Sequence, residues 1–343
     1  MALSASSKIY ECREELSGFF GLGIPENVVF TQNTTHSLNL VIKGLLKSGD
    51  HVIISDMEHN SVLRPILKLQ KERGIRYDVF RTHPHESIIN EVKRLIRRNT
   101  RLLVCTHCPN ISSTVLPIEE IGVLCRSHGI LFVVDAAQSA GHIPINIKKM
   151  NIDALCLPGH KGLYGIQGCG AALLGENVVL DTLTEGGNGI NSLDGFMPTL
   201  PPERYESGTL PTPSIAALCE GLKEIQKIGL DKIRNDEEKL WHYAYERLMS
   251  LDSLTVYEPN HAGSVLTFNI NGIPADRVAA QLGKMDICVR GGYHCSALGH
   301  RTLGTSRSGA VRLGFGIFNT QYDVDALTDA LRRIKIQNIT ARK

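Results

Sequence analysis

The chain has 343 residues and lacks the long apolar runs that mark membrane proteins. No stretch approaches the roughly 20 apolar residues that a membrane-spanning helix needs. Residues 1–21 also lack the apolar core of a secretory signal, and their pattern is that of an amphipathic helix. We therefore expect neither a membrane segment nor export by a cleaved signal.

The chain also lacks an excess of charge of either sign. Its 37 Lys and Arg nearly balance its 35 Asp and Glu, which leaves a formal net charge of +2. This balance gives no reason to expect nucleic acid or an anionic membrane as a partner. The apolar fraction of 42% and the charged fraction of 21% are those of an ordinary globular protein.

The nine cysteines do not form the regular framework of a disulfide-rich secreted domain. Without a signal, this number of thiols favours a reducing compartment, and we expect the cytoplasm. Cys105 and Cys108 form a lone C-x-x-C pair, and no second pair follows at zinc spacing. The sequence therefore predicts no metal site.

The length favours two domains. Continuous apolar runs, which are typical of buried strands, alternate with helical patterns through the first two thirds of the chain. This predicts an α/β domain with a mainly parallel sheet over residues 1–228. Residues 229–343 have the pattern of a smaller α+β domain. The Gly-, Pro- and Asn-rich segment 185–212 is a long loop of the kind that is usually functional or disordered.

Two apolar runs end in unusual polar side chains. One ends in Asp135, with Gln138 three residues further on, and the other leads into His160 and Lys161. Open α/β sheets bind ligands at the carboxyl ends of their strands. An acid and a lysine at this edge are what a pyridoxal phosphate enzyme needs to pair with the pyridine nitrogen and to form a Schiff base. The alternatives are a helix-capping acid and a surface lysine in a Gly-rich loop.

Three further positions have both a structural and a functional interpretation. Thr34 and Thr35 open a predicted helix, where hydroxyls act as caps or bind a phosphate. His59 follows a strand and is either a half-buried polar residue or a ring that stacks on a cofactor. Cys295 lies in a polar loop beside a histidine, unlike the cysteines at apolar positions, and is a candidate nucleophile.

Taken together, these motifs resemble the class V aminotransferase fold family, and within it the cysteine desulfurases and selenocysteine lyases of group II (SUF type). The resemblance covers about residues 28–334. It implies a fold type I pyridoxal phosphate enzyme, with a large domain built on a mainly parallel seven-stranded sheet and a small C-terminal α+β domain.

The resemblance also implies roles for individual residues. The phosphate ligands would be Thr34, Thr35, His160 and Thr209, the last acting on the partner subunit's cofactor in a homodimer with shared active sites. The ring contacts would be Asp135 to the nitrogen, Gln138 to the hydroxyl oxygen, His59 stacked on the face, Asn110 to cofactor and substrate, and Lys161 in the Schiff base. The substrate contacts and the catalytic loop would be Arg290, Arg312 and Cys295.

The implied reaction is conversion of L-cysteine into L-alanine, with a persulfide left on Cys295 and catalysis by Lys161 and His59. The persulfide sulfur would pass to an acceptor protein, for example for iron–sulfur cluster assembly. The alternatives are a selenocysteine lyase, an aminotransferase, and a non-catalytic relative.

Two departures from the family pattern are visible. Pro158 occupies a position where many relatives have a Ser or Thr phosphate ligand, so we expect the phosphate to depend more on the four residues named above. Relatives also begin with an arm similar to Tyr-Leu-Asp-Asn-Ala-Ala-Thr that lines the active site. We expect this chain to lack that arm, because it enters a helix almost at once.

The Schiff-base assignment is directly testable. We expect the purified protein to be yellow, to lose its visible absorption on borohydride reduction, and to carry the reduced cofactor adduct on Lys161. Absorption spectra and peptide mass mapping check this. A colourless protein that takes up no pyridoxal phosphate would favour the non-catalytic alternative.

Overall fold

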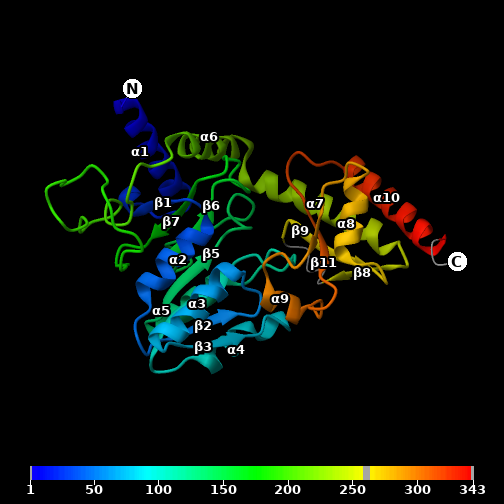
Figure 1. Cartoon of the computed structure of the whole chain (residues 1–343), viewed down its shortest axis with the longest axis horizontal. Coiled ribbons are helices and arrows are strands. Elements are labelled where there is room, and N and C mark those ends of the chain that lie inside the picture. Colours follow the sequence, from blue (N-terminus) through cyan, green and yellow to red (C-terminus); the bar gives the residue numbers. More distant parts are fainter. Residues whose placement is uncertain (1, 258–262, 341–343) are drawn as a thin grey trace. The chain divides into compact units, whose positions relative to one another are not determined.

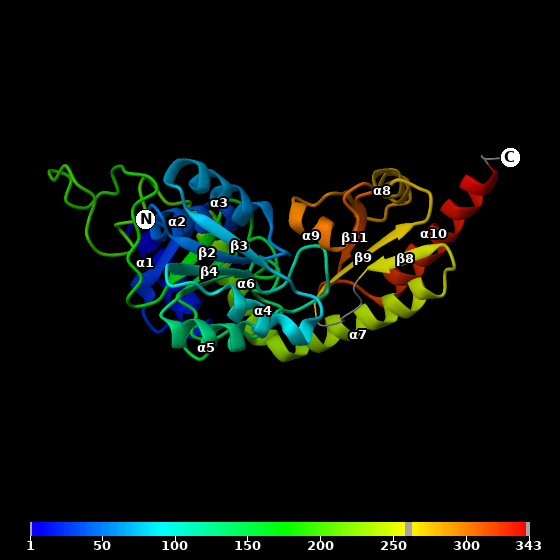
Figure 2. The same cartoon turned by 90° about the horizontal axis from the view of Figure 1, so that it is seen from below.

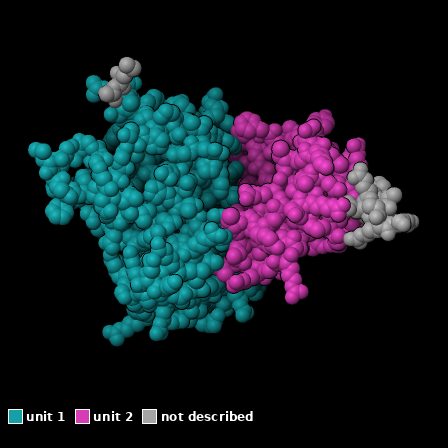
Figure 3. All heavy atoms as spheres, in the orientation of Figure 1, with its two compact units in different colours: residues 1–107, 116–230 teal, residues 108–115, 231–343 magenta. Residues whose placement is uncertain are grey.

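A computed structural model describes residues 2–257 and 263–340 of the chain (Figure 1). The chain divides into two compact units (Figure 3). Unit 1 contains residues 1–107 and 116–230, and unit 2 contains residues 108–115 and 231–343. The segment 108–115 thus belongs to unit 2, although the strands before and after it belong to unit 1. The division into separately folding domains at residue 229 stays a prediction.

Unit 1 is built on a seven-stranded sheet with the order β1-β7-β6-β5-β4-β2-β3. Its strands are β1 (Val28–Thr31), β2 (His51–Ser55), β3 (Arg76–Phe80), β4 (Thr100–Thr106), β5 (Leu131–Asp135), β6 (Ala154–Pro158) and β7 (Gly170–Leu174). Strands β6, β5, β4, β2 and β3, which are neighbours in this order, pair in parallel. Strand β7 is antiparallel to both of its neighbours, β1 and β6. This confirms the predicted α/β class and the mainly parallel seven-stranded sheet.

Helices cover both faces of this sheet, which explains why its strands are continuous apolar runs. Helices α2 (Thr34–Leu45) and α3 (Asn60–Arg73) lie on one face, and α4 (Ile88–Leu95) and α5 (Ile118–His128) lie on the other (Figure 2). Helix α1 (Ala2–Phe19) packs against α6 (Thr212–Ile228). Two short 3-10 turns, Pro25–Asn27 and His85–Ser87, precede β1 and α4.

The carboxyl ends of the parallel strands form a single edge of the sheet. Strand β5 pairs with both β4 and β6, and Asp135 at its end lies opposite Thr106 and Cys156. Because both faces are covered by helices, this edge is the part of the sheet where polar side chains reach solvent or a ligand.

Gly170, the first residue of strand β7, lies close to two neighbouring segments. A Cβ atom on Gly170 would lie 2.7 Å from the carbonyl oxygen of Leu157 and 2.9 Å from the backbone of Asn33. The glycine therefore permits a close approach between β7, β6 and the segment that leads into α2.

Unit 2 contains a four-stranded antiparallel sheet with the order β10-β11-β9-β8. Its elements are α7 (Leu230–Met249), β8 (Leu254–Tyr257), β9 (Val265–Ile270), α8 (Ala275–Gly283), β10 (Arg290–Gly292), α9 (Ala297–Thr302), β11 (Ala310–Gly314) and α10 (Gln321–Thr340). Apolar residues of α7, α8 and α10 pack with β9 and β11 in one core around the buried Trp241. No helix in the described part of the chain is long and apolar enough to cross a membrane.

A glycine of α6 limits the space beside the segment that follows Lys161. A Cβ on Gly221 would lie 2.2 Å from the carbonyl oxygen of Leu163. We expect Gly221→Ala to lower the free energy of unfolding by about 1–3 kcal/mol, because backbone must move to make room. Urea unfolding measures the change.

The control is Gly18→Ala in α1, where nothing lies within 4 Å of the added Cβ. This substitution should raise stability by up to about 1 kcal/mol, as it does in open helix positions. Equal stabilities for the two variants would contradict the close packing at Gly221.

Candidate active site

An acid and a lysine lie at the ends of neighbouring strands in unit 1. Asp135 ends β5 with only 2% of its surface exposed, and its Oδ1 accepts a hydrogen bond from the Ala137 amide at 2.9 Å. Burial raises the pKa of Asp135, while the Ala137 amide and the positive charge of Lys161 oppose this shift. Lys161 itself is exposed. A buried acid of this kind is a suitable partner for a pyridinium nitrogen.

His160 brings an unsatisfied ring nitrogen to the same edge. Its Nδ1 is buried and has no hydrogen-bond partner. Burial lowers the pKa of His160, and the charge of Lys161 adds to the effect, so the ring is neutral near pH 7. Buried polar atoms are normally hydrogen-bonded, so this nitrogen fits a contact with a bound group.

The start of α2 fits an anion. Thr34 is buried and Thr35 is exposed, and the Asn33 side chain caps the helix by accepting from the His36 amide at 3.1 Å. Amides in the first turn of a helix lack partners within it, and the helix dipole favours negative charge there. The segment therefore offers hydroxyls and amides that suit a phosphate.

His59 and Thr35 are connected by a serine that the sequence did not reveal as a site residue. His59 caps α3 by accepting from the Ser61 amide at 3.1 Å, which leaves the proton of the neutral ring on Nε2. The Ser61 hydroxyl lies 2.7 Å from His59 Nδ1 and 2.7 Å from the Thr35 hydroxyl. Two motifs that are separate in the sequence therefore meet through Ser61.

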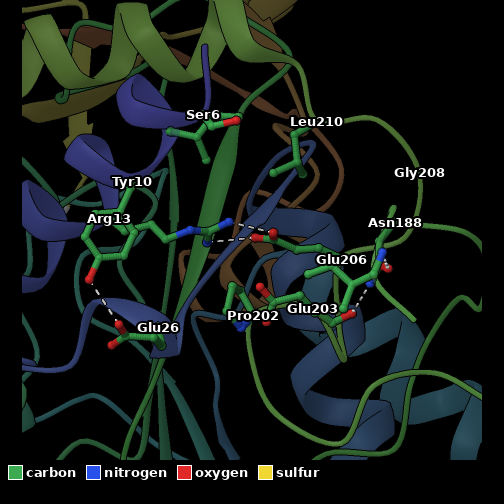
Figure 4. Close-up of a pocket in the computed structure, with 12 residues that line it drawn as sticks. Ser6, Tyr10, Arg13, Glu26, Asn188, Pro202, Glu203, Glu206, Gly208 and Leu210 are labelled. Atoms are coloured by element: carbon green, nitrogen blue, oxygen red, sulfur yellow. Dashed lines mark hydrogen bonds and ion pairs between the residues drawn. The ribbon is translucent and has the colours of Figure 1, made fainter. Parts of the chain in front are cut away.

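The segment with Thr209 is anchored by a buried ion pair (Figure 4). Glu206 binds the Arg13 guanidinium through two hydrogen bonds of 2.9 and 2.6 Å, and it accepts the Phe30 amide at 2.6 Å. Burial raises the pKa of Glu206, and the Arg13 charge opposes that shift. The ion pair connects α1 and β1 to this loop, in which Thr209 is exposed. Gln138, which follows β5, is half-buried.

Glu58 is a buried acid near Asp135, and it was not predicted from the sequence. It is fully buried, and its Oε1 accepts from the Ser55 hydroxyl and from the Thr106 amide at 2.8 Å, whereas Oε2 has no partner. Burial raises the pKa of Glu58 to about 8, and the Asp135 charge adds to the shift. Glu58 is therefore a neutral acid at pH 7, one residue before His59.

Unit 2 brings the other predicted residues together. The Asn110 amide donates to the His294 carbonyl oxygen at 2.6 Å, and the Arg312 guanidinium donates to the Asn110 carbonyl oxygen at 3.0 Å. Arg312 pairs with Arg290 across β10 and β11, and burial lowers the pKa of Arg312, followed by the charge of Arg290. Two guanidinium groups side by side suit a carboxylate ligand.

Cys295 follows directly and differs from most other cysteines of the chain. Only Cys288 and Cys295 are exposed among the nine cysteines, all of which lie in the described residues. Burial is the main cause of a raised pKa at each of the other seven thiols, which are Cys12, Cys105, Cys108, Cys125, Cys156, Cys169 and Cys219. These seven are inert core residues, because the thiolate is the reactive form.

Comparison with known proteins agrees with this chemistry. The Aminotransferase class-V family model matches residues 1–327. The chain belongs to this family, whose cofactor is pyridoxal 5′-phosphate.

Individual relatives cover nearly the whole chain. It is 31% identical over 344 residues to a probable cysteine desulfurase of Methanothermobacter thermautotrophicus, covering 97% of this chain and 85% of the relative. A probable cysteine desulfurase of Pyrococcus abyssi is 32% identical over 342 residues, covering 96% and 84%. The apo structure of a cysteine desulfurase from Thermococcus onnurineus superposes with a TM-score of 0.90 at 33% identity, covering 97% and 84%.

The residues present fit the family's cofactor. The unpartnered His160 Nδ1 and the first turn of α2 suit a phosphate, and the buried Asp135 suits a pyridine nitrogen. The sequence missed the supporting residues Ser61, Glu58 and Arg13, because their roles depend on contacts between distant segments. For Glu58 a signal existed, since it lies only three residues after the apolar strand β2 and acids are rarely buried.

The raised pKa of Glu58 has a consequence for stability. Between about pH 4.3 and pH 8 the native state keeps the Glu58 proton and the unfolded chain loses it, so this stabilisation decreases as the pH rises and levels off above pH 8. Glu58→Gln cannot titrate. We expect the stability difference between wild type and this variant to change by at most about 1.4 kcal/mol per pH unit across that window.

Urea unfolding at several pH values from 5 to 9 measures the difference. Glu119→Gln, on the exposed first turn of α5, is the matched control and should show no such trend. A constant difference between wild type and Glu58→Gln would show that Glu58 is ionised in the native state.

Proposed function

We propose that the protein is a cysteine desulfurase that converts L-cysteine into L-alanine and leaves a persulfide on Cys295. The observation that carries the proposal is the placement of an exposed cysteine directly after His294, whose carbonyl oxygen is bound by Asn110. Asn110 is bound in turn by Arg312, a residue suited to a substrate carboxylate. The relatives that cover nearly the whole chain are named as cysteine desulfurases.

The residues of unit 1 would hold the cofactor. Lys161 would form the Schiff base, Asp135 would pair with the ring nitrogen, and Gln138 would contact the ring hydroxyl oxygen. His59 would stack on the ring, and the phosphate contacts would be those of Thr34, Thr35, His160 and Thr209. When bound, pyridoxal phosphate withdraws electrons from the α-carbon of an amino acid.

The remaining steps belong to the chain's own side chains. Arg312, with Arg290 beside it, binds the substrate carboxylate, and Asn110 orients the substrate. Lys161, as a free amine, would take the α-proton of the substrate. The thiolate of Cys295 then attacks the substrate sulfur, the carbon–sulfur bond breaks, and the electron pair on carbon collects protons. The balance is one cysteine and one enzyme thiol giving one alanine and one persulfide.

Assembly and partners follow from the same proposal. Thr209 is exposed at the end of its anchored segment, which suits a contact with the partner subunit's cofactor in a homodimer. The persulfide would be passed to a sulfur-acceptor protein, and L-selenocysteine is the alternative substrate. All nine cysteines are unpaired, which suits the reducing cytoplasm.

The assignment of the nucleophile is tested by Cys295→Ala with Cys288→Ala as the matched control. We expect Cys295→Ala to lose at least about 100-fold of the sulfide release from L-cysteine with dithiothreitol, because the attacking thiolate is gone. Cys288→Ala removes the other exposed thiol and should keep wild-type turnover.

Both variants should keep the visible absorption of the bound cofactor, because neither cysteine is among the residues proposed to hold it. Product analysis separates the alternatives: alanine with sulfide supports the desulfurase, a keto acid points to transamination, and activity only with selenocysteine points to the lyase. Undiminished sulfide release by Cys295→Ala would contradict the assignment of Cys295 as the nucleophile.

A further inference from the structure

The backbone of the Cys295 loop has an unfavourable conformation. His294 and Cys295 are consecutive residues with positive φ angles of 50° and 56°. Residues other than glycine avoid this left-handed region, because their Cβ approaches the following carbonyl oxygen. Contacts from the surrounding residues must therefore hold the two residues there.

The His294 ring is held in one protonation state. Its Nε2 lies 3.0 Å from the Arg290 carbonyl oxygen, which can only accept, so Nε2 carries the ring proton. Burial is the main cause that lowers the pKa of His294 to about 4, and the nearby charges of Arg312 and Arg290 add to it. Nδ1 is therefore an acceptor at neutral pH, and it lies 3.4 Å from His300 Nε2.

The His300 ring connects His294 to Thr305 through hydrogen bonds. It is 2% exposed, and its Nδ1 lies 2.6 Å from the hydroxyl of Thr305, which is 1% exposed. Burial lowers the pKa of His300, and the Tyr293 carbonyl is a further acceptor for this ring. A neutral His300 with its proton on Nε2 donates towards His294, so Nδ1 accepts from the Thr305 hydroxyl. The rings of His294 and His300 are nearly parallel, at 13°.

We propose that Thr305, His300 and His294 form a directional chain of hydrogen bonds that holds Cys295 in its left-handed conformation and so positions its thiol. The direction is set at one end, because the Arg290 carbonyl oxygen accepts only. The three are positioning residues, and none of them needs to touch the substrate. The purpose of this positioning rests on the proposed function, whereas the hydrogen-bond chain itself does not.

A matched pair of substitutions tests the chain in the full-length protein. Thr305→Val keeps the shape of the side chain and removes the hydroxyl, whereas Thr305→Ser keeps the hydroxyl. In wild type and Thr305→Ser, the ¹⁵N shifts of both rings at pH 7 should show neutral histidines protonated on Nε2. In Thr305→Val, the ¹⁵N shift of His300 Nδ1 should move to that of a ring nitrogen that accepts no hydrogen bond, and amide exchange in segment 290–296 should rise about tenfold, as expected for one lost buried hydrogen bond.

Amide exchange in the core strand β9 is the internal reference and should stay at the wild-type rate. Unchanged exchange in segment 290–296 of Thr305→Val, or wild-type rings protonated on Nδ1, would overturn the proposal. A further readout is kcat for sulfide release, which should fall in Thr305→Val with little change in KM and recover in Thr305→Ser. If wild type releases no sulfide but the ring and exchange results are as expected, the proposed function fails and the hydrogen-bond chain stands.

Discussion

The covering of the parallel sheet on both faces is the constraint on which the rest of unit 1 depends. Strands β2, β6 and β7 are buried along their whole lengths, so a charged side chain within them would lose its hydration without compensation. Polar chemistry is consequently confined to the strand ends. This is why Asp135 terminates β5 and why His160 and Lys161 come after β6 rather than within it.

Burial also sets the protonation states near these ends. It raises the pKa of both Asp135 and Glu58, but only Asp135 is close enough to the Lys161 charge to have its shift opposed by it. Two neighbouring buried carboxyl groups repel each other when both are ionised, and Glu58 is the one that keeps its proton. The result is one carboxylate available for a ring nitrogen and one neutral acid that holds the Thr106 amide at the end of β4.

In unit 2 the same desolvation acts on bases. Burial lowers the pKa of His294, His300 and Arg312, and at His294 and Arg312 nearby positive charges add to this shift. Neutral histidines can act as both donor and acceptor, so they can hold a loop in a conformation that backbone preferences disfavour. The exposed Cys295 thus follows a neutral, hydrogen-bonded histidine, whereas seven other thiols are packed in the core.

The sequence by itself determined the α/β class and the mainly parallel sheet, because apolar runs that end in polar residues are local patterns. The family followed from the resemblance of its short motifs, which are also local. It also placed Asp135, Lys161 and Cys295 at strand ends or in a polar loop, for the same reason. Only the tertiary structure decided how Ser61 joins His59 to Thr35, how Arg13 anchors the segment of Thr209, and how Thr305 connects to His294. These contacts join segments that turns and helices separate, and hydrogen-bond geometry over such separations depends on packing that no local pattern records.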